Sequence, residues 1–79
     1  MANDPAPVLQ DLFRAVFNLS AADDVTGISQ ETRPEWDSLA TVTLVTAIES
    51  EFDFELDPVD ALELTSYDAV LEYVRRRVG

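Results

Sequence analysis

The chain has 79 residues, and its sixteen acidic residues against five basic ones give it a net charge of −11. A chain of this length has room for one small domain with a thin core, so we expect a single domain over residues 1–79 without a deep catalytic cleft. The negative charge argues against nucleic acid as a partner, because phosphate contacts need a basic face, and it favours proteins with basic patches.

The absent residue types restrict the chemistry further. The sequence contains no His, no Cys and no Lys. Without His a Ser-His-Asp arrangement is impossible, and without Cys or His a structural zinc site is excluded in practice. We therefore expect neither an enzyme nor a metal site. No apolar run reaches the roughly 18 residues of a membrane span, and no basic region followed by an apolar stretch opens the sequence, so we expect a cytoplasmic protein.

Asp4 and Pro5 predict the start of a first helix, with the aspartate as the N-cap and the proline in the first turn. Residues 1–3, which precede them, are expected to be disordered. Apolar residues then recur at helical spacing through about residue 18. These residues are Val8, Leu9, Leu12, Phe13, Val16 and Phe17.

Residues 19–37 form a predicted loop. They show no sustained hydrophobic period and include Gly27, Pro34 and several acidic residues, which is typical of loops. A connection of this length inside a small domain is unusual, and such loops are often functional. Val25, Ile28 and Trp36 are expected to pack the loop against the helices.

The second predicted helix extends from Ser38 to Phe52. One side is an apolar stripe that belongs in the core, and the opposite side carries no charge, although a protein this acidic would ordinarily expose acids there. The uncharged side indicates contact with a partner; the alternative is that Leu39 folds back onto the loop and the rest is ordinary surface. The core stripe comprises Thr41, Leu44, Val45, Ile48 and Phe52, and the uncharged side comprises Leu39, Val42, Thr43, Thr46 and Ser50.

Acidic residues occupy alternate positions from Glu49 to Asp57. Clustered carboxylates attract divalent cations, but this segment lacks the spacing and the glycine of an EF-hand loop. A weak cation site and a solvated acidic loop both remain open, and the solvated loop is favoured. Phe54 and Leu56, which lie between the acids, are expected to enter the core.

Asp57 and Pro58 repeat the helix-start signal and predict a short third helix over Val59–Leu64. Thr65 and Ser66 predict the cap of a fourth helix. Three arginines in its last turn complement the negative end of the helix dipole. Its buried stripe is expected to comprise Tyr67, Val70, Leu71, Val74 and Val78. Three longer helices, a short one and a long first loop together make an all-α bundle.

Ser38 stands where the long loop meets the second helix. A helix start leaves backbone N–H groups unpaired and carries the positive end of the macrodipole. Ser38 therefore either caps the helix or carries a phosphate that those N–H groups help to hold.

Asp37, Ser38 and Leu39 match the Asp-Ser-Leu signature of a phosphopantetheine attachment site, and residues 42–52 (VTLVTAIESEF) read like the helix that follows it. Residues 52–56 and 65–74 are similar to the next loop and to the last helix of the same family. By these segments the chain resembles an acyl carrier protein of the phosphopantetheine-binding carrier family. The resemblance implies a four-helix bundle of acyl-carrier type, with three longer helices, a short third helix and a long loop between the first two.

The resemblance also implies a cofactor and partners. A phosphopantetheinyl transferase would move 4'-phosphopantetheine from coenzyme A onto Ser38, and Asp37 and Leu39 would help that transferase to dock. Val42 and Thr46 match partner-facing positions further along the helix. The loaded monomer would carry acyl groups as thioesters between acyl-loading and acyl-transferring enzymes.

The chain departs from the pattern of fatty acid synthesis. Ala40, Thr43 and Ser50 replace acids that such carriers usually show, and Trp36 before Asp37 looks like free-standing carriers of specialised pathways. The pathway is therefore left open between a fatty-acid-like, a polyketide and another specialised one. An alternative from another class is an acidic helical adaptor that binds a basic protein and is never modified.

Overall fold

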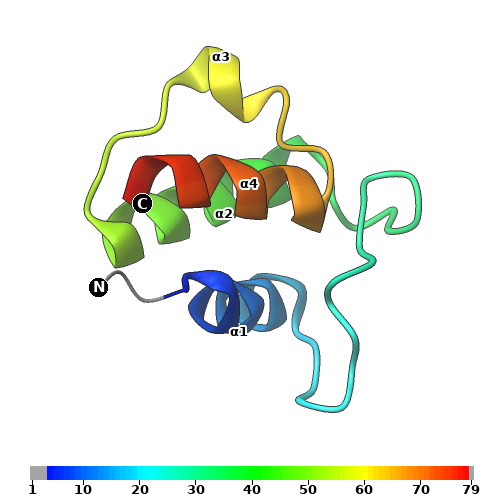
Figure 1. The fold of residues 1–79 in the computed structure, drawn as a ribbon. Helices are drawn as coiled ribbons and strands as arrows, with labels where there is room; N and C mark the ends of the chain where they lie inside the picture. Colours follow the sequence, from blue (N-terminus) through cyan, green and yellow to red (C-terminus); the bar gives the residue numbers. More distant parts are fainter. Residues whose placement is uncertain (1–3, 79) are drawn as a thin grey trace.

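The computed structural model describes residues 4–78, without the side chain of Val78, and this part contains four helices and no strand. They are α1 (Ala6–Phe17), α2 (Ser38–Phe52), α3 (Pro58–Ala61) and α4 (Tyr67–Val78). In Figure 1, α1 (blue) lies on one side of α2 and α4, and α3 (yellow) lies on the other. The predicted all-α bundle with a short third helix is confirmed. The predicted disorder of residues 1–3 and the predicted burial of Val78 lie outside the described part.

The start of α1 follows the chemistry of Asp4 and the prolines. The Asp4 carboxylate accepts a hydrogen bond from the Ala6 N–H at 3.1 Å, and the Leu9 N–H bonds to the Pro5 carbonyl at 2.9 Å. Proline fits the first turn because its missing N–H would have no partner there. The Asp4 side chain therefore bonds to the first turn, but Pro5 holds the N-cap position and α1 begins at Ala6, so the predicted start, with Asp4 as the N-cap, is one residue early.

Phe13 lies at the centre of the core. Its ring packs edge-on against Trp36 from the long loop and Tyr67 from α4, with ring centroids 5.5 and 5.1 Å apart. One side chain thus joins α1 to two distant parts of the chain, in the edge-to-face geometry that aromatic rings favour. The buried apolar residues are Leu9, Phe13, Val25, Ile28, Trp36, Leu44, Ile48, Leu56, Leu64, Tyr67, Val70 and Val74.

The long loop is irregular but firmly attached. Its predicted anchors, Val25, Ile28 and Trp36, are all buried, as expected. The Tyr67 N–H donates to the Ile28 carbonyl at 2.8 Å, so the backbone of the loop is also bonded to the start of α4. The loop therefore reaches Trp36, and the start of α2, in a defined position.

The third helix is shorter than predicted. We expected it over Val59–Leu64, but α3 ends at Ala61. The N–H groups of the next residues bond to carbonyls three residues back, including Leu64 to Ala61 at 3.2 Å, which tightens the chain relative to an α-helix. This tightening brings Leu64 into the core while Leu62 stays on the surface.

The start of α4 and its basic end agree with the sequence. The Ser66 hydroxyl accepts the Ala69 N–H at 3.1 Å, which confirms the predicted cap. Arg75, in the last turn, forms an ion pair with Asp4 at 3.2 Å and so joins the end of α4 to the start of α1.

Candidate functional site

Asp37 organises the start of α2. Its backbone is extended, with φ −98° and ψ −170°, and its side chain accepts the Ala40 N–H at 2.9 Å. Asp37 is therefore the N-cap, which rules out capping as the role of Ser38, one of the two alternatives that the sequence left open. Ser38 is the first helical residue. A capping side chain belongs to the residue before it, so the Ser38 hydroxyl does not cap α2. No hydrogen bond joins the Ser38 hydroxyl to another described residue, and the residue is exposed.

Asp37→Ala is expected to lower the free energy of unfolding by about 1 kcal/mol, because the variant loses a helix cap. Ser38→Ala is the matched control, and its effect should stay within about 0.5 kcal/mol. Urea unfolding followed by circular dichroism measures both. A larger loss for Ser38→Ala than for Asp37→Ala would return the capping role to the serine.

Trp36 fastens the residues before Ser38 to the rest of the fold. Its indole N–H donates to the Thr41 hydroxyl at 3.0 Å, and that hydroxyl donates to the Asp37 carbonyl at 3.0 Å. The Trp36 ring also packs on Phe17 of α1, with centroids 5.5 Å apart. These contacts hold the loop and the first turn of α2 in one arrangement, so Ser38 is presented from a rigid base.

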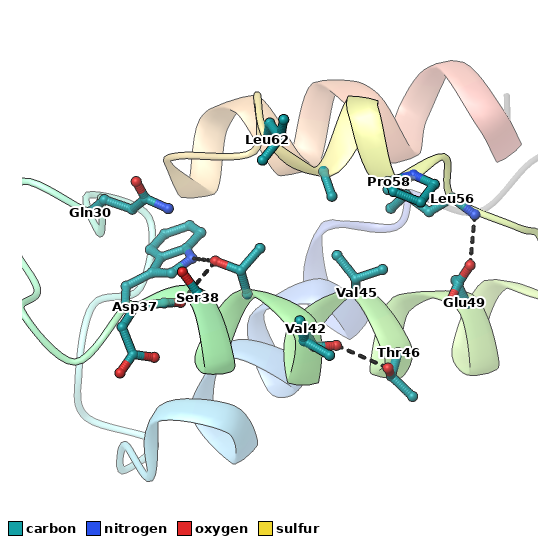
Figure 2. Close-up of a pocket in the computed structure, with 13 residues that line it drawn as sticks. Gln30, Asp37, Ser38, Val42, Val45, Thr46, Glu49, Leu56, Pro58 and Leu62 are labelled. Carbon is teal, nitrogen blue, oxygen red and sulfur yellow. Dashed lines mark hydrogen bonds between the residues drawn. The ribbon is translucent and has the colours of Figure 1, made fainter.

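A groove of about 830 Å³ opens beside Ser38 and extends between α2 and the segment around α3. Figure 2 shows Asp37 and Ser38 at one end, Glu49 at the other, and Leu62 above α2. The Glu49 carboxylate closes the far end by accepting the Leu56 N–H at 2.7 Å. The apolar residues along its walls are Trp36 from the long loop, Val42 and Val45 from α2, and Leu56, Pro58, Ala61 and Leu62 from the other side. The groove is thus suited to an elongated, largely apolar group attached near Ser38.

The outward side of α2 is more apolar than its sequence suggests. Leu39 is 74% exposed and Val42 is 61% exposed, which rules out the alternative that Leu39 folds back onto the loop. The hydroxyls of Thr43 and Thr46 donate to the carbonyls of Leu39 and Val42 at 3.0 and 2.9 Å. Because each hydroxyl donates its proton to its own helix, these threonines can only accept hydrogen bonds from a partner.

The acidic segment from Glu49 to Asp57 does not gather its carboxylates. Within the described residues there is no group of three or more acidic side chains arranged to hold a metal ion. Leu56 is buried and Phe54 is partly buried against the core, as predicted. Residues 49–52 belong to α2, and residues 53–57 form the loop that follows, in which Asp53, Glu55 and Asp57 are exposed. The Glu49 carboxylate instead turns toward the Leu56 N–H.

Four of the five predicted site residues line the groove, and Leu39 lies outside it. The four are Asp37, Ser38, Val42 and Thr46. The sequence reasoning missed Leu62 and Pro58, which form the opposite wall. Pro58 and Leu62 are spaced four residues apart, as on one helical face, and this spacing was the available signal.

A fold of four helices with an exposed serine at the start of the second, beside an apolar groove, is the architecture of a carrier protein. The model of the family described as the phosphopantetheine attachment site matches residues 35–74, half of the chain. The chain belongs to this family, and its cofactor is covalently attached 4'-phosphopantetheine. No curated protein and no solved structure gave a significant match. In the described residues, each helix is too short or too polar to cross a bilayer.

Proposed function

We propose that Ser38 receives the 4'-phosphopantetheine arm, and that the chain carries acyl groups between the enzymes of a fatty-acid-like, polyketide or other specialised pathway. The observation that carries this proposal is the exposed Ser38 hydroxyl, which has no hydrogen-bond partner among the described residues and lies at the mouth of the groove. When bound, the arm supplies a thiol that holds acyl groups as thioesters. The site fits such a group, because a phosphate at Ser38 would lie at the N-terminus of a long helix.

The roles of the neighbouring residues follow from their contacts. Asp37 holds the first turn of α2 by its cap, and Trp36 holds the loop before it through Thr41. Val42, Val45 and Leu62 would contact the arm or its cargo along the groove. The chain has no His to act as a base, so we propose that it is a carrier and not an enzyme, and that a phosphopantetheinyl transferase supplies the base for attachment.

Partner recognition is proposed to involve Asp37, Leu39, Val42 and Thr46. Leu39 and Val42 offer exposed apolar area next to Ser38, and Thr46 can only accept hydrogen bonds from a partner because its hydroxyl donates to the Val42 carbonyl. The absence of acids at Ala40, Thr43 and Ser50 supports dedicated partners that read shape and apolar contact more than charge. The monomeric state and the cytoplasmic location stay predictions.

Intact mass spectrometry tests the function directly. Incubation with coenzyme A and a transferase of broad specificity should raise the mass by one phosphopantetheine group, and fragmentation should locate that group on Ser38. A chain that stays unmodified with several such transferases would contradict the proposal and favour the acidic adaptor.

Leu39→Ala is expected to lower kcat/KM for arm loading by about tenfold, since loss of a few buried methyl and methylene groups at an interface costs about 1.4 kcal/mol. Glu49→Gln, which removes a charge but keeps an acceptor for the Leu56 N–H, should change kcat/KM less than about twofold. Steady-state loading assays measure both variants. A greater effect of Glu49→Gln would show that charge dominates recognition.

A further inference from the structure

The helix α3 has little to hold it in place by burial. It comprises four residues, none of them fully buried. Val59 is 68% exposed, and Leu62, directly after the helix, is 78% exposed. Leu56 and Leu64 are buried, but they lie in the chain before and after α3. The segment is therefore anchored at its two ends, and its middle needs another attachment to keep one position.

Tyr73 of α4 provides that attachment. Its hydroxyl donates to a carboxylate oxygen of Asp60 in α3 at 2.9 Å, in a partly buried position. Within the described residues, no other side-chain hydrogen bond joins α3 to another helix. The ordinary pKa of a tyrosine phenol, about 10, already keeps it protonated at neutral pH, and burial raises the pKa of Tyr73 further, so its hydroxyl remains a donor.

Two further groups fix the Tyr73 ring. The Arg77 guanidinium donates to the Tyr73 oxygen at 3.0 Å and lies 5.3 Å from the centroid of its ring. It also lies 5.7 Å from the centroid of the Phe54 ring, which packs beside Tyr73 at 6.3 Å. Because the ring is held from two directions, its hydroxyl stays directed at Asp60.

The position of α3 matters for the groove. Pro58, Ala61 and Leu62 form the wall that faces Val42 and Val45 of α2 (Figure 2). A displacement of α3 away from α2 would widen the groove along its length. We propose that Tyr73 and Asp60 are positioning residues that hold α3 over α2, and so determine how well a group carried from Ser38 is shielded from water. The shielding rests on the proposed carrier function, whereas the attachment of α3 does not.

Tyr73→Phe tests the attachment, because phenylalanine keeps the ring contacts and loses only the hydroxyl. In the unmodified protein, amide hydrogen exchange in residues 58–64 should become roughly three- to tenfold faster, the change expected for one lost hydrogen bond. Exchange in α1 should not change, which also confirms that the variant folds. Unchanged exchange in residues 58–64 would overturn the proposal whether or not Ser38 accepts an arm.

The chain offers matched controls. Tyr67→Phe removes a hydroxyl from the same helix, but that hydroxyl bonds to the Ala6 carbonyl at 3.5 Å, away from α3. Tyr67→Phe should leave exchange in residues 58–64 unchanged. Asp60→Asn keeps an acceptor and should behave like the unaltered chain, whereas Asp60→Ala should match Tyr73→Phe. An Asp60→Asn variant as fast as Asp60→Ala would show that the carboxylate charge, and not the hydrogen bond, is responsible.

Shielding is tested on protein loaded with a medium-chain acyl thioester and treated with hydroxylamine. Hydroxylamine attacks the thioester carbonyl, the acyl group leaves as a hydroxamate, and the thiol is released, so intact mass follows the rate. Tyr73→Phe should react several-fold faster than the unaltered chain, and Tyr67→Phe should not. Faster exchange in residues 58–64 with an unchanged thioester rate would overturn the shielding role.

Discussion

Ser38→Ala is expected to abolish arm loading completely. After incubation with coenzyme A and a transferase, the unaltered chain should gain the mass of one phosphopantetheine group, and the variant should gain none. The variant removes the only atom to which the phosphate is proposed to attach. Because Asp37 and not Ser38 caps α2, the loss should come without loss of the fold, which circular dichroism verifies.

The remaining serines are internal controls for this experiment. Alanine replaces each of the other four serines in turn, and each variant should load like the unaltered chain. These serines are Ser20, Ser29, Ser50 and Ser66. Ser66→Ala also loses the cap of α4, so its stability should fall while its loading persists at a temperature where it is folded. Loading of Ser38→Ala, or loss of loading in one of the other four variants, would contradict the assignment.

The largest effect on stability is expected for Phe13→Ala. The Phe13 ring is fully buried and contacts Trp36 and Tyr67, so its removal leaves a cavity where α1, the long loop and α4 meet. Truncation of a buried phenylalanine costs about 3–5 kcal/mol. Native domains have only about 5–15 kcal/mol of stability, and a small domain lies at the low end, so the variant should be close to unfolded.

Urea unfolding followed by circular dichroism measures this effect. Val8→Ala is the matched control on the same helix, because Val8 is 36% exposed and its truncation leaves no enclosed cavity. Its free energy of unfolding should change by less than about 0.5 kcal/mol. Equal unfolding midpoints for Phe13→Ala and the unaltered chain would mean that the packing around Phe13 is not the centre of the core.

Helix positions and buried residues followed from the sequence because they depend on local chemistry. The bounds of α2 were predicted from apolar spacing, and the start of α1 was predicted to within one residue from Asp4 and Pro5. The sequence left open whether Ser38 caps α2, since Asp37 and Ser38 are both good N-caps and spacing alone does not choose between neighbours; the structure assigns the cap to Asp37. The predicted end of α3 at Leu64 was wrong because the chain tightens after Ala61. This tightening accompanies the burial of Leu64, which depends on tertiary packing and not on local sequence.

The groove was beyond sequence reasoning for a different reason. Its two walls come from α2 and from the segment around α3, so it exists only once the helices are placed relative to one another. The link between Tyr73 and Asp60 spans thirteen residues and depends on the same placement. The hydrogen bonds of the Thr43 and Thr46 hydroxyls depend on the side-chain rotamer, which the residue type alone does not determine.

The ion pair between Asp4 and Arg75 has a practical consequence for handling the protein. It brings the two ends of the described chain together, and Figure 1 shows them at the end of the bundle away from the start of α2. A biotin tag or a surface linker attached through either end would therefore leave Ser38 facing the solution. Immobilised in this way, the protein would be attached at a point distant from the serine, and binding of an enzyme could be followed on a sensor without masking Ser38.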